Sequence, residues 1–126
     1  MNRIILSFTI LGLLLIYSAY SESYLMDYCE ETLTTLETCA EQIKKEVYPQ
    51  AEITADKLLA DLEKRNTLLR VIIGDSDVSK VYGKIVAVSC YIDDAIYDEC
   101  IVAIRECQGN VRELKEQNRT GFGNVL

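Results

Sequence analysis

The sequence predicts an all-α protein: a small, disulfide-stapled bundle of three amphipathic helices that follows a cleaved signal peptide. Over most of the chain after residue 21, apolar residues recur at steps of three and four, which is the period of an amphipathic helix. Two pairs of cysteines also share one spacing, since Cys29 and Cys39 are as far apart as Cys90 and Cys100. The length of 126 residues favours a single domain.

Residues 1–21 have the features of a secretory signal peptide. A positively charged start precedes the apolar stretch Ile4–Ile16, and the small residues Ala19 and Ser21 stand where a signal peptidase would cut before Glu22. The apolar stretch is shorter than the roughly 20 residues that a membrane span needs. We therefore expect cleavage and secretion rather than an uncleaved membrane anchor.

Residues 22–117 form the predicted helical domain, with helices expected at about 22–48, 50–73 and 77–108. The first helix has an unbroken heptad seam, which consists of Met26, Cys29, Leu33, Leu36, Ala40, Ile43 and Val47. Pro49 separates the first two helices because the residue before a proline avoids the helical region. It fits the first turn of the second helix equally well.

The ends of the later helices are marked by glycines and polar residues. Gly74 is the predicted stop of the second helix, and Asp75-Ser76-Asp77 offers side-chain oxygens that can cap the third. Gly109-Asn110 ends the third helix, which carries the longest apolar run of the mature chain. Residues 118–126 are expected to form a flexible tail, because they are terminal and polar and contain two glycines. No internal repeat is evident.

The cysteines are expected to form disulfides because the chain follows a secretory route. Ten helical residues rise about 15 Å, whereas a disulfide needs Cα atoms about 4.4–6.8 Å apart, so neither pair can bond within its own helix. With the first and third helices parallel, the equal spacings favour Cys29–Cys90 and Cys39–Cys100. Short turns would instead place Cys39 level with Cys90. The single bond Cys39–Cys90 therefore stays open, as does the antiparallel pairing of Cys29–Cys100 with Cys39–Cys90.

Cys107 is the odd cysteine of the five. It lies one heptad after Cys100, close to the end of the third helix. One interpretation is an interchain disulfide, which would link a homodimer through Cys107. The other is a buried free thiol, because unpaired cysteine is among the most buried residue types.

Catalytic and metal-binding chemistry is poorly supported. The chain has no histidine, which removes Ser-His and Cys-His dyads and histidine-ligated zinc. Asp94 and Asp98 form an i,i+4 pair on one expected helix face, but one face supplies too few oxygens for a cation. We interpret these acids as a solvated face or an acidic patch for a basic partner. The net charge of −7 argues against nucleic-acid binding. We expect no enzyme activity, no metal and no cofactor.

The expected function is that of a secreted, extracellular binding protein. It would be a venom- or gland-type component, or an extracellular ligand, that presents a helical face to an extracellular protein, a membrane receptor or a channel. The alternative is a carrier that holds a small apolar ligand in a cavity between the helices. The residues of the wide apolar stripe that would line this cavity are Leu59, Leu68, Ile73 and Ile101. Asn118-Arg119-Thr120 is a sequon that would place a glycan on Asn118.

Overall fold

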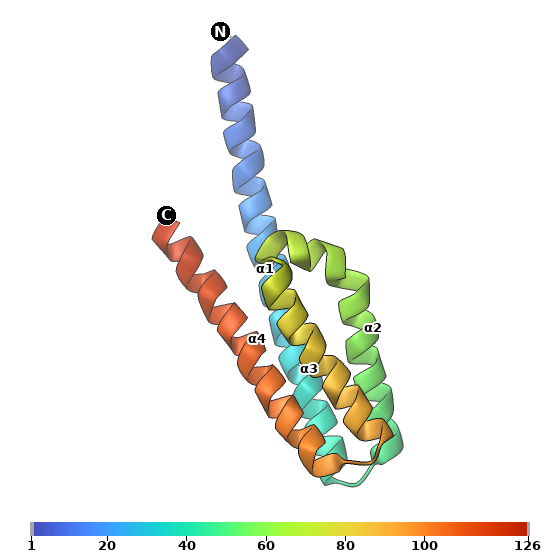
Figure 1. Cartoon of the computed structure of the whole chain (residues 1–126). Coiled ribbons are helices and arrows are strands. Elements are labelled where there is room, and N and C mark those ends of the chain that lie inside the picture. The colour runs from blue at the N-terminus through green and yellow to red at the C-terminus, as the bar shows by residue number, and fades with distance from the viewer. Residues whose placement is uncertain (1, 126) are drawn as a thin grey trace.

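The computed structural model describes residues 2–125, with side chains described for residues 2–117. Its helices are α1 (Asn2–Lys44), α2 (Tyr48–Ile73), α3 (Asp75–Asp93) and α4 (Tyr97–Val125), and no strand occurs among the described residues. Successive helices run in opposite directions and form an elongated bundle (Figure 1). The all-α class is confirmed. The predicted count of three helices is wrong, because the bundle has four.

Each helix packs against the two helices beside it. Contacts join α1 to α2, α2 to α3, α3 to α4 and α4 back to α1, while none joins α1 to α3 or α2 to α4 within residues 2–125. The bundle is therefore square in cross-section, with the parallel helices α1 and α3 on one diagonal. The α1–α2 and α3–α4 connections lie together at one end (Figure 1). We call this the turn end.

The boundaries of α2 follow from the residues at its two ends. Pro49 lies in its first turn, where a missing N–H does no harm. Gly74 has a φ of 93°, which glycine adopts readily, so the predicted stop is confirmed. The side-chain cap expected from Asp75-Ser76-Asp77 is not formed. Asp75 and Asp77 instead place negative charge in the first turn of α3, where the helix dipole favours it.

The predicted helix over 77–108 is interrupted at Ala95, which is why the bundle has a fourth helix. Ala95 has a φ of 58°, in the left-handed region that residues other than glycine seldom occupy. The N–H of Ile96 donates to the carbonyl oxygen of Tyr91 at 2.8 Å, so the end of α3 keeps a hydrogen-bond partner. Neither glycine nor proline marks this turn in the sequence, and the helical period of apolar residues continues across it.

The connection between α1 and α2 has the same backbone geometry as the one between α3 and α4. Glu46 corresponds to Ala95, 49 residues later, and has a φ of 60°. The N–H of Val47 donates to the carbonyl oxygen of Gln42 at 2.9 Å, which matches the bond made by Ile96. The bundle therefore consists of two equivalent helical hairpins, although the sequence suggested no internal repeat.

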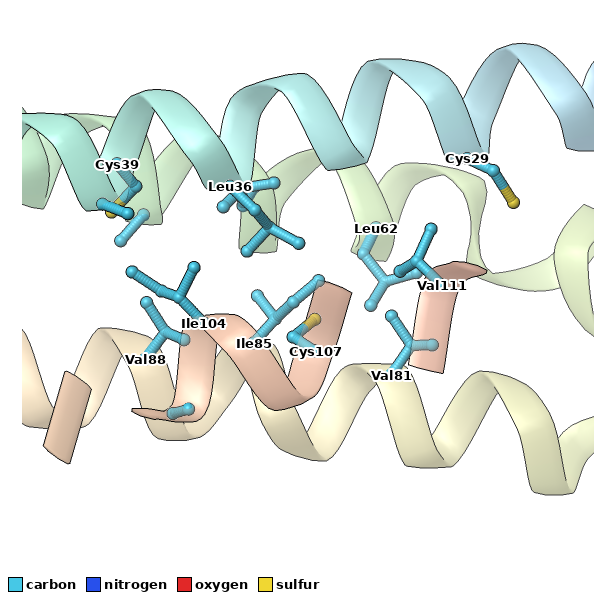
Figure 2. Close-up of a cluster of buried hydrophobic side chains, with 14 of the residues drawn as sticks. Cys29, Leu36, Cys39, Leu62, Val81, Ile85, Val88, Ile104, Cys107 and Val111 are labelled. Atoms are coloured by element: carbon cyan, nitrogen blue, oxygen red, sulfur yellow. The ribbon is translucent and has the colours of Figure 1, made fainter. Parts of the chain in front are cut away.

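The core is built from equivalent positions of the two hairpins. The interval of 49 residues relates Leu36 to Ile85 and Leu62 to Val111, and each of these side chains is 1% exposed or less. Figure 2 shows all four converging on the centre of the bundle, one from each helix. Further buried pairs at this interval are Cys29 and Val78, Cys39 and Val88, Ile43 and Ile92, Ala51 and Cys100, Ala55 and Ile104, and Leu58 and Cys107.

Polar side chains close the seam between α1 and α4. The carboxylate of Glu37 accepts hydrogen bonds from Gln108 Nε2 at 3.0 Å and from Arg105 at 2.6 Å. These bonds hold the pKa of Glu37 below its ordinary value. Arg105 also donates to Gln108 Oε1 at 2.9 Å. Gln108 is only 2% exposed, and this network satisfies its amide despite the burial.

The N-terminal part of α1 projects beyond the bundle (Figure 1). None of residues 2–20 is buried, and Ser21, 4% exposed, is the first buried residue of the chain as described. α1 is long and apolar enough to cross a membrane, a property that signal sequences share. The junction between the projecting helix and the bundle thus falls at residue 21.

Candidate binding surface and the cysteine positions

All five cysteines carry free thiols, and no disulfide links the residues that the structure describes. Cys29 and Cys39 lie on α1, Cys90 on α3, and Cys100 and Cys107 on α4. Four of them are buried, and Cys90 is exposed. The disulfide staples expected from the sequence are therefore not formed in this structure. Each predicted pairing can still be compared with the positions that the helices give the sulfurs.

This fold places the partners of the predicted pairing Cys29–Cys90 in different layers of the bundle. Figure 2 shows Cys29 far along α1 from Cys39, while Val88, two residues before Cys90, lies at the Cys39 end of the view. Cys29 and Cys39 are ten helical residues apart, a rise of about 15 Å, so the fold disfavours a bond between Cys29 and Cys90. The pairing assumed an unbroken third helix that could slide along the first. Since α1 and α3 make no contact, the fold also disfavours Cys39–Cys90.

Cys39 and Cys100 lie in one layer near the turn end, on the adjacent helices α1 and α4. The thiol of Cys39 donates to the carbonyl oxygen of Ala51 at 3.7 Å, and that of Cys100 donates to Val88 at 3.6 Å. Burial raises the pKa of Cys39 to about 12, and the neighbouring Cys100 thiol adds to the rise. Cys39–Cys100 is thus the predicted bond whose partners this fold brings near each other, and it stays a prediction.

Cys107 fits the interpretation of a buried free thiol. It is 0% exposed and lies among the central core side chains (Figure 2). Burial raises its pKa to about 12. A homodimer linked through Cys107 would need the bundle to open first, because its sulfur has no access to a second chain. Cys90, on the surface of α3, is the cysteine whose thiol another molecule can reach.

In the reduced, folded protein we expect one thiol to react rapidly with Ellman's reagent, and the other four only after unfolding. Cys90 is exposed, whereas the others are buried as well as protonated, and the reactive species is the thiolate. The measurement is the amplitude of the fast phase with and without denaturant. Cys90→Ser should remove the fast phase. If that phase persisted in the variant, the assignment of burial to the other cysteines would be wrong.

The turn end carries an apolar and aromatic centre. Tyr48 and Tyr97, which are equivalent in the two hairpins, stack with ring centroids 3.8 Å apart and an interplanar angle of 7°. Beside them Val47 is 38% exposed and its equivalent Ile96 is 43% exposed. Apolar side chains of this size normally gain from burial, so the exposed pair is available to another molecule.

Carboxylates surround this centre. Asp94 lies in the connection after α3 and Asp98 in the first turn of α4, so they do not share the single helix face that the sequence predicted. Burial raises the pKa of Tyr48, and Glu46, Tyr97 and Asp98 add to the rise, which places these groups close to the stacked rings. The turn-end surface, as we define it, comprises Val47, Tyr48, Ile96 and Tyr97 with the acids Glu46, Asp93, Asp94, Asp98 and Glu99.

The described residues offer little to a small ligand or a metal. One depression lies between α1 and α2 on the outside of the bundle, with a lining that includes Glu37, Glu41, Gln42 and Lys45. The centre is filled by side chains instead (Figure 2), so the carrier alternative gains no support. Among the described residues, no three side chains that could serve as metal ligands lie together. The side chain of Asn118, the predicted glycosylation site, lies outside the described residues.

Sequence reasoning missed the apolar half of the turn-end surface. The predicted seam of the first helix includes Val47, and Ile96 falls inside the third helix predicted over 77–108. The sequence feature that could have identified both residues is the 49-residue interval between equivalent positions of the two hairpins. Few residues are identical at this interval, so the equivalence is recognised from the spacing of the buried positions. No protein-family model matches the chain, and neither curated proteins nor solved structures show a significant match to it.

Proposed function

We propose that the chain is exported and that its four-helix bundle acts as a non-enzymatic binding protein, a venom- or gland-type component or an extracellular ligand for a receptor or channel. One observation carries the export step. The cleavage predicted before Glu22 coincides with the junction at which the exposed apolar part of α1 ends and the bundle begins at Ser21. Removing residues 1–21 would therefore leave the bundle almost whole.

The chemistry of the bundle supports binding rather than catalysis. The sequence has no histidine, and four of its five thiols are buried, which disfavours their reactive thiolate form at neutral pH. The acidic balance disfavours nucleic acid and anionic lipid surfaces as partners. A protein partner with basic character fits the remaining surface best.

The export step is tested by expressing the full chain in a secretory eukaryotic host and measuring the intact mass of the protein in the medium. We expect the loss of residues 1–21, and addition of a glycan if Asn118 is used. Ala19→Arg should abolish the cleavage, because the site requires a small residue at this position. Tyr20→Arg is the matched control, since the position between the two small residues tolerates large side chains.

Two results would contradict export with cleavage. Retention of residues 1–21 in a membrane fraction that resists alkaline extraction would mean that the projecting part of α1 is an anchor. A chain that stays soluble in the cytosol would mean that this part of α1 directs no export. Both results can be recognised by measuring the intact mass of the protein in the medium, membrane and cytosolic fractions of the same cells.

A further inference from the structure

We propose that the turn-end surface docks a cationic, amphipathic helix of a partner protein, with apolar side chains at its centre and lysine or arginine at its edges. This rests on the proposed binding function and adds the surface and the chemistry of the partner. Two independent features of one end of the bundle support this assignment: exposed apolar groups and an excess of negative charge.

The exposed apolar groups are concentrated around the turn end. Four large apolar side chains of the bundle form two equivalent pairs at the 49-residue interval: Val47 with Ile96, and Ile53 with Val102. Ile53 and Val102 lie within the first two turns of α2 and α4, close to the two connections. Only Val71, at the other end of α2, lies apart from this group among the exposed large apolar residues described in the bundle.

The carboxylates of the turn-end surface form no ion pair with any described side chain. Along the sides of the bundle some acids are also unpaired, such as Glu52 and Asp56, but several others form ion pairs. Glu31 pairs with Arg65, Glu37 with Arg105, Glu106 with Lys84, and Glu30 with Lys115. The turn end carries five acidic residues, and the nearby basic residues are Lys44 and Lys45. Negative charge therefore exceeds positive charge at this end of the described bundle, by five acids to two lysines.

The stability of the helices explains only part of this charge. Asp98 and Glu99 lie in the first turn of α4, where the helix dipole favours acids. Asp93 and Asp94 lie at the C-terminal end of α3, where the same dipole disfavours them. Two acids thus occupy positions that cost the isolated bundle stability, which is expected where an outside positive charge compensates them.

The same charge decides between the occupants that could cover an apolar patch. A second copy of this chain would bring its own five acids against these five, and like charges across an interface oppose association. An anionic lipid surface is repelled for the same reason. A helix with an apolar stripe bordered by lysine or arginine satisfies both features. The surface is small, so we expect weak, salt-sensitive binding.

The test uses the protein as its host exports it and a fluorescein-labelled synthetic amphipathic helix of leucine and lysine, with binding followed by fluorescence anisotropy at physiological salt. A leucine and glutamate helix of the same length is the charge control. We expect the lysine helix to bind at micromolar concentration and the glutamate helix not to bind. If the protein were retained in the membrane, the same titration would be made on the full chain in nanodiscs. Binding of the lysine helix would then be tested independently of export.

Two matched pairs of variants locate the site. The double variant Asp93→Lys with Asp94→Lys should weaken binding of the lysine helix about tenfold. The control is the double variant Glu113→Lys with Glu116→Lys, which makes the same change of charge toward the far end of α4. This control should have little effect on binding. Val47→Ser with Ile96→Ser should weaken binding about tenfold through lost apolar burial, while Val71→Ser should not. Circular dichroism checks that each variant is folded.

Three outcomes would overturn the proposal. The first is equal weakening by both charge variants, which would mean that net charge alone attracts the helix. The second is no binding of the lysine helix by a protein that is exported and processed as proposed, which would leave the export result intact. The third is concentration-dependent self-association in sedimentation that Val47→Ser with Ile96→Ser abolishes, which would identify a second copy of this chain as the occupant.

Discussion

Replacing Leu36 by alanine should lower the free energy of unfolding by about 3 kcal/mol. Leu36 is 0% exposed and lies at the centre of the bundle with Leu62 and Ile85 (Figure 2). The substitution removes buried methyl groups and leaves a cavity that the four surrounding helices can only partly fill. Because Ile85 is the equivalent residue of the other hairpin, Ile85→Ala should cost a similar amount. Urea unfolding of the reduced protein, followed by circular dichroism, measures both.

The matched control is Val71→Ala. Val71 is 66% exposed on α2, so its truncation should change the free energy of unfolding by no more than about 0.5 kcal/mol. Leu36 and Ile85 belong to one core, so the double variant should depart from additivity. A large cost at Leu36 combined with a negligible cost at Ile85 would show that the α3–α4 hairpin does not unfold together with the α1–α2 hairpin.

The reduced protein should lose stability steeply as the pH rises above about 9. Burial raises the pKa of Cys107 and Cys39 to about 12, and that of Cys29 and Cys100 to about 11, from the ordinary thiol value of 9.0. The unfolded chain therefore releases protons that the folded chain keeps. Stability is present in full below the unfolded pKa and is lost as the pH rises toward the folded values, by about 1.4 kcal/mol per pH unit for each thiol.

Urea midpoints measured from pH 7 to pH 10.5 under reducing conditions would record this loss. Cys107→Ala should reduce the loss of stability per pH unit by the contribution of one thiol. Cys90→Ala should leave this loss unchanged, because Cys90 is exposed. Oxidised protein containing a Cys39–Cys100 bond has two buried thiols fewer, so its slope should be about half as steep. An unchanged slope in Cys107→Ala would mean that this thiol titrates alike in both states.

The sequence was sufficient for the helical class and for the core faces of the helices, because burial follows the 3.6-residue period. Cys29, Leu36, Ala40 and Ile43 of the predicted first seam are buried, whereas Met26 and Leu33 are only partly buried and Val47 is exposed. The stop at Gly74 is confirmed. The sequence was insufficient at Ala95, where an alanine takes a left-handed conformation without glycine or proline to announce it.

The predicted helix end at Gly109-Asn110 is a separate error, because α4 continues through these residues. Other differences follow from the turn at Ala95. With the third helix taken as continuous, its direction after the turn was wrong, and the predicted register of Cys29 with Cys90 depended on that direction. The stacked pair Tyr48 and Tyr97, and the exposed pair Val47 and Ile96, depend on two connections meeting in space. Periodicity along a single chain segment carries no information about such a meeting.

The continuity of α1 through residue 21 sets an order of events. The peptide bond between Ser21 and Glu22 lies inside a helix, and Ser21 is buried against the bundle. A peptidase acts on locally unfolded chain, so this bond is accessible only while α1 is still unwound there. Under the proposed export, removal of residues 1–21 must come before the four helices assemble. A chain that completed its fold first would shield its own cleavage site and keep the apolar helix, so premature folding alone would convert a secreted protein into a membrane-held one.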